Sequence, residues 1–143
     1  MRYAVQSLIA FLALAAPAVA DEAWSTQLGE VFWESDAGDT AVLALHVDTK
    51  EDAVGETVRF YIVGLSADVM GGRGAYSGYW TSTSDEPLCD AGLTDSSGKV
   101  THAWGRIDMT FVSDAFPSQW TAQMGHCFAD PDSLITGVPI TGE

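Results

Sequence analysis

Hydrophobic and polar residues alternate along much of the chain beyond residue 20, a period of two that is typical of β-strands with one buried face. The clearest alternating runs are residues 40–48, 57–65 and 100–112. In the last of these, one face carries Ala103, Gly105, Ile107, Met109 and Phe111. We therefore expect three long strands, each with its apolar side against a core.

Shorter β-rich runs lie at residues 30–34, 75–83 and 119–128. A last piece at 135–140 is expected to be a short edge strand, because Pro139 limits its pairing. Clusters of Gly, Asp, Ser and Pro separate the runs, and no segment beyond residue 20 shows a 3.6-residue period with caps. The pattern predicts an all-β fold, a compact antiparallel β-sandwich or small barrel of about six to eight strands.

The first 20 residues differ from the rest of the chain. Arg2 precedes an apolar run that is short for a membrane span, Pro17 interrupts it, and Ala18 and Ala20 are small residues at the −3 and −1 positions of a cleavage site. This order predicts a secretory signal peptide at 1–20, cleaved after Ala20, followed by a single domain at 21–143. No later apolar run is long enough to span a bilayer, so the exported protein should be periplasmic or secreted.

The predicted mature chain is strongly acidic. All 20 acidic residues but only five of the six basic ones lie beyond residue 20, which changes the formal charge from −14 for the whole chain to −15. Such a field repels phosphate backbones and anionic lipid headgroups. We therefore expect no nucleic-acid partner; the charge itself suits solubility, or a basic partner.

Cys89 and Cys127 are the only cysteines. In an oxidising compartment an even pair predicts a disulfide, and only one intramolecular pairing exists. The spacing that a metal or redox motif needs is lacking.

Aromatic residues supply the best candidate site. Trp104 lies between His102 and Arg106 on the face opposite the apolar row of the 100–112 run. We expect this row to be at least partly exposed, so that the indole could stack on a sugar or aromatic ring, with Tyr79 or Tyr61 nearby. The alternative is that the face is covered and forms a second core layer.

Motifs for other chemistry are weak, so no catalytic residue, metal site or cofactor is assigned. His46, His102 and His126 would form a zinc site only if their strands converged. Acidic pairs such as Asp36 with Asp39, or Asp130 with Asp132, do not match a calcium loop. The glycines of 71–74 lack the remainder of a phosphate-binding loop.

The sequence thus favours an exported, non-enzymatic binding module for a carbohydrate, small ligand or protein. One alternative is a protein inhibitor or assembly factor that presents the polar loop 84–99 to a basic partner. A small hydrolase is the third alternative.

Overall fold

The computed structural model describes residues 22–47, 55–66, 74–84, 88–95, 97–112 and 118–140. The predicted signal peptide and most of the glycine loop 71–74 lie outside these residues. Within the described part of the chain, no helix has the length and hydrophobicity that crossing a membrane would require.

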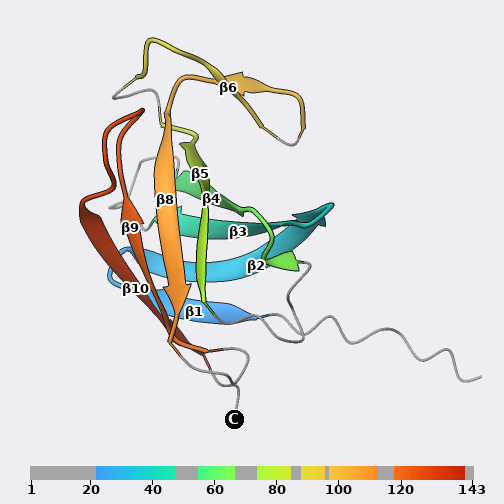
Figure 1. The fold of residues 1–143 in the computed structure, drawn as a ribbon, viewed down its shortest axis with the longest axis vertical. Helices are drawn as coiled ribbons and strands as arrows, with labels where there is room; N and C mark the ends of the chain where they lie inside the picture. Colours follow the sequence, from blue (N-terminus) through green and yellow to red (C-terminus); the bar gives the residue numbers. More distant parts are fainter. Residues whose placement is uncertain are drawn as a thin grey trace, which may run out of the picture.

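Eight antiparallel strands form a closed barrel (Figure 1). Around the barrel their order is β1, β10, β9, β8, β5, β4, β3, β2, and β2 pairs with β1 to close the ring. Their bounds are β1 Ala23–Thr26, β2 Gly29–Ala37, β3 Thr40–Val47, β4 Glu56–Ile62, β5 Ala75–Ser82, β8 Trp104–Phe111, β9 Trp120–Met124 and β10 Ser133–Pro139. The predicted all-β fold is confirmed, in its barrel form.

The barrel interior is filled by the apolar faces that the alternation predicted. Apolar residues that are less than 10% exposed come from seven of its strands and include Trp24, Val31, Leu43, Leu45, Phe60, Ile62, Ile107, Met109, Phe111, Trp120 and Ile135. The rings of Trp24 and Trp120 meet edge to face at 6.3 Å, and the Trp24 Nε1–H donates to the carbonyl of Ser118 at 2.9 Å. Because side chains occupy the interior, sites for ligands must be sought on the outside.

Two strand predictions need correction. The 100–112 run is broken at His102 and Ala103, which separate the short β7 (Val100–Thr101) from β8. The 135–140 piece is not an edge strand, because β10 pairs with β9 on one side and β1 on the other. Pro139 is tolerated because it is the last residue of β10.

A small hairpin lies beyond one end of the barrel, at the top of Figure 1. It pairs β6 (Leu93–Thr94) with β7, and its turn is organised by Asp95. One carboxylate oxygen of Asp95 accepts hydrogen bonds from the backbone N–H groups of Ser97 and Lys99 and from the Ser97 hydroxyl. These bonds lower the pKa of Asp95, with the Ser97 hydroxyl contributing most.

Candidate functional site

Three of the five predicted binding residues lie in one row across the outer surface. Tyr61 on β4 pairs with Tyr79 on β5, and Tyr79 pairs with Arg106 on β8. All three side chains point outward because their neighbours along each strand, among them Phe60, fill the core.

The prediction that Trp104 is partly exposed is wrong. Its side chain also points away from the barrel, but it is only 2% exposed. The indole N–H donates to the carbonyl of Ala91 at 2.8 Å, and the rings of Phe128 and Tyr79 meet it edge-on at 4.9 and 6.1 Å. Trp104 is therefore the centre of a small second core between β8 and the segment before β6.

His102 does not join the row. It is exposed at the bend before β8, and its Nδ1 lies 2.9 Å from the carbonyl oxygen of Cys89. The structure thus brings together Tyr61, Tyr79 and Arg106, covers Trp104, and leaves His102 at the end of the barrel.

A cleft on the outer face of β2–β5 is the best-formed candidate site, and we call it the outer cleft. Its volume is about 370 Å³. The barrel strands and Thr83 form its floor and the β6–β7 hairpin forms one wall; together they contribute Glu34, Ser35, Val42, Thr57, Arg59, Tyr61, Thr81, Ser82, Thr83, Asp95, Ser97, Lys99 and Thr101. Of these residues only Tyr61 was expected at the site.

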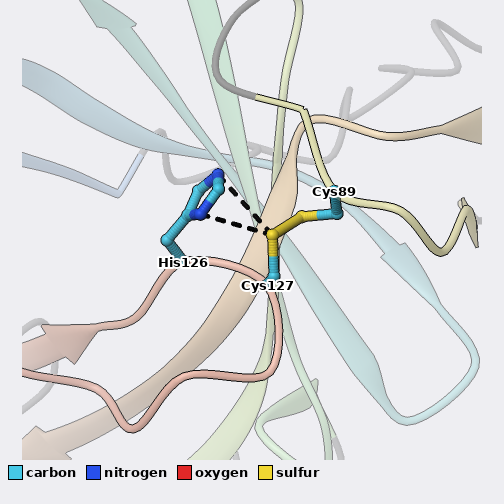
Figure 2. Close-up of side chains that lie close together, drawn as sticks. All are labelled: Cys89, His126 and Cys127. Carbon is cyan, nitrogen blue, oxygen red and sulfur yellow. Dashed lines mark hydrogen bonds between the residues drawn. A yellow bond between two sulfur atoms is a disulfide. The ribbon is translucent and has the colours of Figure 1, made fainter.

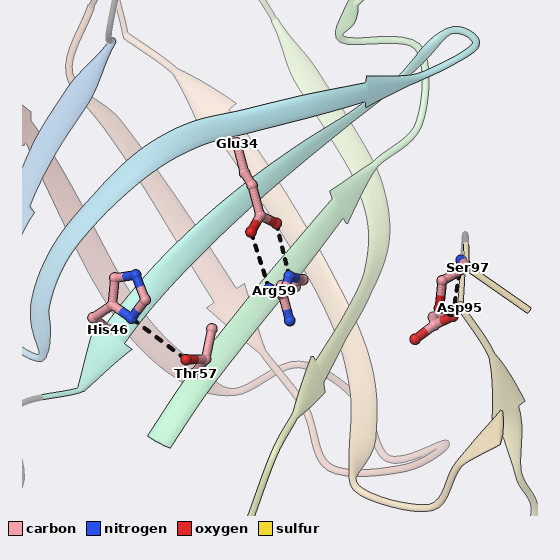
Figure 3. Close-up of polar contacts among 6 residues, drawn as sticks. All are labelled: Glu34, His46, Thr57, Arg59, Asp95 and Ser97. Carbon is pink, nitrogen blue, oxygen red and sulfur yellow. Dashed lines mark hydrogen bonds and ion pairs between the residues drawn. The ribbon is translucent and has the colours of Figure 1, made fainter. Parts of the chain in front are cut away.

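An ion pair crosses the floor of the outer cleft (Figure 3). Arg59 donates from Nε and Nη2 to the two carboxylate oxygens of Glu34, at 2.7 and 2.9 Å. These hydrogen bonds lower the pKa of Glu34 and raise that of Arg59. Both side chains are about one-third exposed. Both side-chain hydrogen bonds of Arg59 use Nε and Nη2, so the other terminal nitrogen, Nη1, makes none to a described residue.

A β-bulge positions Glu34. The pairing of β2 with β3 shifts between Trp33 and Ser35, so that Glu34 is the extra residue of the bulge. Beneath the ion pair, Val42 and Ala44 face outward and yet are buried, at 2% and 0% exposure. Their partners on β4 are Tyr61 and Arg59. Because Val42 and Ala44 are buried, the floor of the cleft is packed.

The Lys and Arg side chains of the described residues lie on the face of the molecule that carries the outer cleft and a second cleft along the same strands. Within the described ranges the only Lys and Arg residues are Arg59, Lys99 and Arg106. The first two line the outer cleft, where they balance Glu34 and Asp95. In a chain with a formal charge of −14, the charges of the described residues that line the outer cleft therefore sum to zero.

A second cleft of about 360 Å³ lies farther along the same strands. It is lined by Val63, Ser77, Gly78, Tyr79, Arg106, Asp108 and Pro131. Arg106 donates to the Asp130 carboxylate at 2.9 Å, and the Ser77 hydroxyl donates to Asp108 at 2.7 Å.

The predicted disulfide is confirmed: Cys89 and Cys127 are bonded, with sulfurs 2.08 Å apart. His126 lies against it, with Nδ1 3.3 Å from the Cys127 sulfur (Figure 2). These three residues are the one group of three potential metal ligands in the described part of the chain. Because the two sulfurs are bonded to each other, neither is a thiolate ligand in this state.

The histidines and acidic pairs considered as metal ligands from the sequence make other contacts in the structure. His46 stacks on Phe32, while His126 lies beside the disulfide, so the three histidines do not form a cluster among the described residues. Asp36 accepts hydrogen bonds from Trp33 and Ser66, and Asp130 pairs with Arg106.

Comparison of the chain with protein-family models, with curated proteins and with solved structures finds no match. The geometry of the outer surface is therefore the basis on which a function is inferred.

Proposed function

We propose that this protein is an exported, non-enzymatic binding module that holds a small carbohydrate in the outer cleft. The observation that carries the proposal is the lining of that cleft. Eight of the 13 described residues that line it bear hydroxyl groups, and the two cations among them are balanced by two acids. A neutral, hydrogen-bonding surface of this kind matches a ligand with many hydroxyl groups better than it matches an ion or an apolar molecule.

Side chains in the cleft are held in place before a ligand arrives. Glu34 and Arg59 fix each other by two hydrogen bonds, and Asp95 fixes the turn that forms the wall. Pre-organisation of this kind reduces the entropy lost on binding. Tyr61 adds a partly buried ring that could pack against the face of a sugar.

The state of the carboxylates favours binding over hydrolysis. A glycosidase needs one acid whose pKa is raised so that it can donate a proton near neutral pH. In the outer cleft the pKa values of Glu34 and Asp95 are both lowered, chiefly by hydrogen bonds from Arg59 and Ser97. Both acids are therefore ionised and engaged with neighbours.

Export is supported by the N-terminal sequence and agrees with the disulfide. Residues 1–20 have the order of a signal peptide, and the bond between Cys89 and Cys127 suits an oxidising compartment.

A glycan array probed with the mature protein tests this function directly. We expect at least one neutral glycan to bind, and expect Arg59→Gln and Tyr61→Ala to abolish its signal. The matched control is Leu134→Ala, at an exposed apolar position on β10 outside the cleft. Absence of any bound glycan, or equal binding by the Arg59 and control variants, would refute the proposal.

A second candidate function follows from the hairpin beyond the barrel end. Figure 1 shows it projecting, and the Cys89–Cys127 bond ties the chain to the barrel just before it. A tethered projection is what an inhibitor or assembly factor would present to a basic partner. Binding of basic proteins that is lost on Asp90→Asn, with the outer cleft unaltered, would favour this alternative.

A further inference from the structure

The two clefts on the outer surface follow one another along the same pair of strands. Thr57 and Thr83 lie at one end of β4 and β5 and line the outer cleft. At the other end, Val63 and Ser77 line the second cleft. The six steps along the chain from Thr83 back to Ser77 correspond to about 20 Å at the usual rise of an extended chain. That length exceeds the size of a single sugar ring.

The clefts meet at the two tyrosines. Tyr61 lines the outer cleft, Tyr79 lines the second, and they are direct partners in the pairing of β4 with β5. Side chains opposite each other on one sheet face are close neighbours. Tyr79 is 40% exposed, so its ring is accessible to a ligand.

The second cleft repeats the chemistry of the outer one. Each cleft has an arginine held by a carboxylate: Arg59 by Glu34 in one, Arg106 by Asp130 in the other. In the second cleft the Ser77 hydroxyl donates to the Asp108 carboxylate, while Arg106 is paired with Asp130 beside the lining. Both clefts are thus polar, rich in hydrogen-bonding groups and bordered by a tyrosine.

We infer that the second cleft is a further subsite of the same binding site, and that the ligand is a neutral oligosaccharide lying along β4 and β5 across both clefts. This inference rests on the proposed function. The outer cleft holds one end of the oligosaccharide, the two tyrosines contact the rings at the centre, and Arg106 with Asp108 bind hydroxyl groups of the following unit. A ligand that fills both subsites gains affinity because the second contact is intramolecular.

Calorimetric titration with ligands of increasing length tests the inference. The probes are neutral oligosaccharides of one to six units, built from glucose, xylose, mannose or N-acetylglucosamine. For the series that binds, affinity should rise by about tenfold or more between the shortest and longest members, as expected when a second subsite is engaged.

A variant of the second cleft identifies the source of that gain. Asp108→Asn should remove the dependence on length while leaving the affinity for the shortest binding ligand unchanged. It suits this test because Asp108 lines the second cleft but not the outer one, is exposed, and keeps its size on substitution. Asp132→Asn, at an exposed acid outside both clefts, is the matched control.

The outcomes are distinguishable. Binding that does not depend on length, or equal losses for short and long ligands in the Asp108 variant, would overturn the extended site and leave the outer cleft intact. Absence of binding by every series would overturn the proposed carbohydrate function and this inference with it.

Discussion

At the scale of single residues, a side chain's role depends on what covers it rather than on the face it points to. Trp104 and Tyr79 both point outward from neighbouring strands, yet they are 2% and 40% exposed. The difference arises because Phe128 and the carbonyl of Ala91 contact the Trp104 ring. Trp104 is a packing residue, and Tyr79 is available to a ligand.

The burial of Trp104 predicts a large loss of stability on truncation. Trp104→Ala should lower the free energy of unfolding by about 3–5 kcal/mol, the usual cost of removing a buried Trp. Chemical denaturation measures it, with Leu134→Ala, at a 61% exposed side chain, as the control that changes little. A loss below about 1 kcal/mol would show that the indole is not packed as described.

The ion pair in the outer cleft predicts a dependence on pH. The pKa of Glu34 in the folded protein is lowered from its ordinary 4.5, mainly by the hydrogen bonds from Arg59. The pair therefore stabilises the fold fully above pH 4.5, and this contribution is lost as the pH falls through the lowered pKa. Glu34→Gln should cost less than about 1 kcal/mol at pH 7, because the pair is partly exposed.

Unfolding experiments from pH 7 down to pH 3 with wild type, Glu34→Gln, Arg59→Gln and the double variant isolate this contribution. The coupling between the two residues should decrease towards the acidic end, as Glu34 becomes protonated. Coupling that is independent of pH would contradict the assigned ion pair.

At the scale of elements, the structure depends on a few connections between strands and loops. The disulfide joins the segment before β6 to the loop after β9, across a sequence separation of 38 residues. It thereby holds in place the segment whose Ala91 carbonyl binds Trp104.

Replacing both cysteines by serine should lower the free energy of unfolding by about 2–4 kcal/mol, since the cross-link restricts the unfolded chain. Denaturation of the oxidised protein and the Cys89→Ser/Cys127→Ser variant measures the loss. Equal stability of the two proteins would mean that the tether contributes nothing to the fold.

The strands were predictable to the extent that alternation marks one buried face. The runs that contain Leu43, Phe60 or Ile107 could be predicted because every second residue in each run is apolar and lies in the core. Strand β1 was missed because four residues are too few to show a period. The bulge at Glu34 left no pattern either, since it depends on the register between two strands.

The outer cleft was predictable only in part, for the same reason. Tyr61, Tyr79 and Arg106 share a row because adjacent strands pair in register, and alternation already placed them on outward faces. Glu34, Asp95 and Lys99 come from β2 and from the hairpin, and no local pattern shows that these elements flank β4. Contacts between elements distant in sequence determine that part of the site.

At the scale of the whole molecule, positive and negative charges are unevenly distributed over the surface. The formal charge is −14, while the described cations lie on the surface that carries the two clefts. Excess negative charge destabilises a compact domain by repulsion between its acids, and salt screens this repulsion.

The melting temperature should therefore rise when sodium chloride increases from about 10 mM to about 150 mM, a range over which the screening length shortens severalfold. Differential scanning calorimetry measures the change. A melting temperature that is constant over this range would show that the acids are compensated locally.

We propose that the outward face of β4 and β5 is the ligand-binding surface. An NMR titration of the isotopically labelled protein, residues 21–143, with a neutral oligosaccharide that binds tests this directly. We predict that the shifted amide signals cluster at residues 57–63 and 77–83, with further shifts at Arg106 and Asp108. Shifts confined to the hairpin tip, or to β9 and β10, would contradict the account.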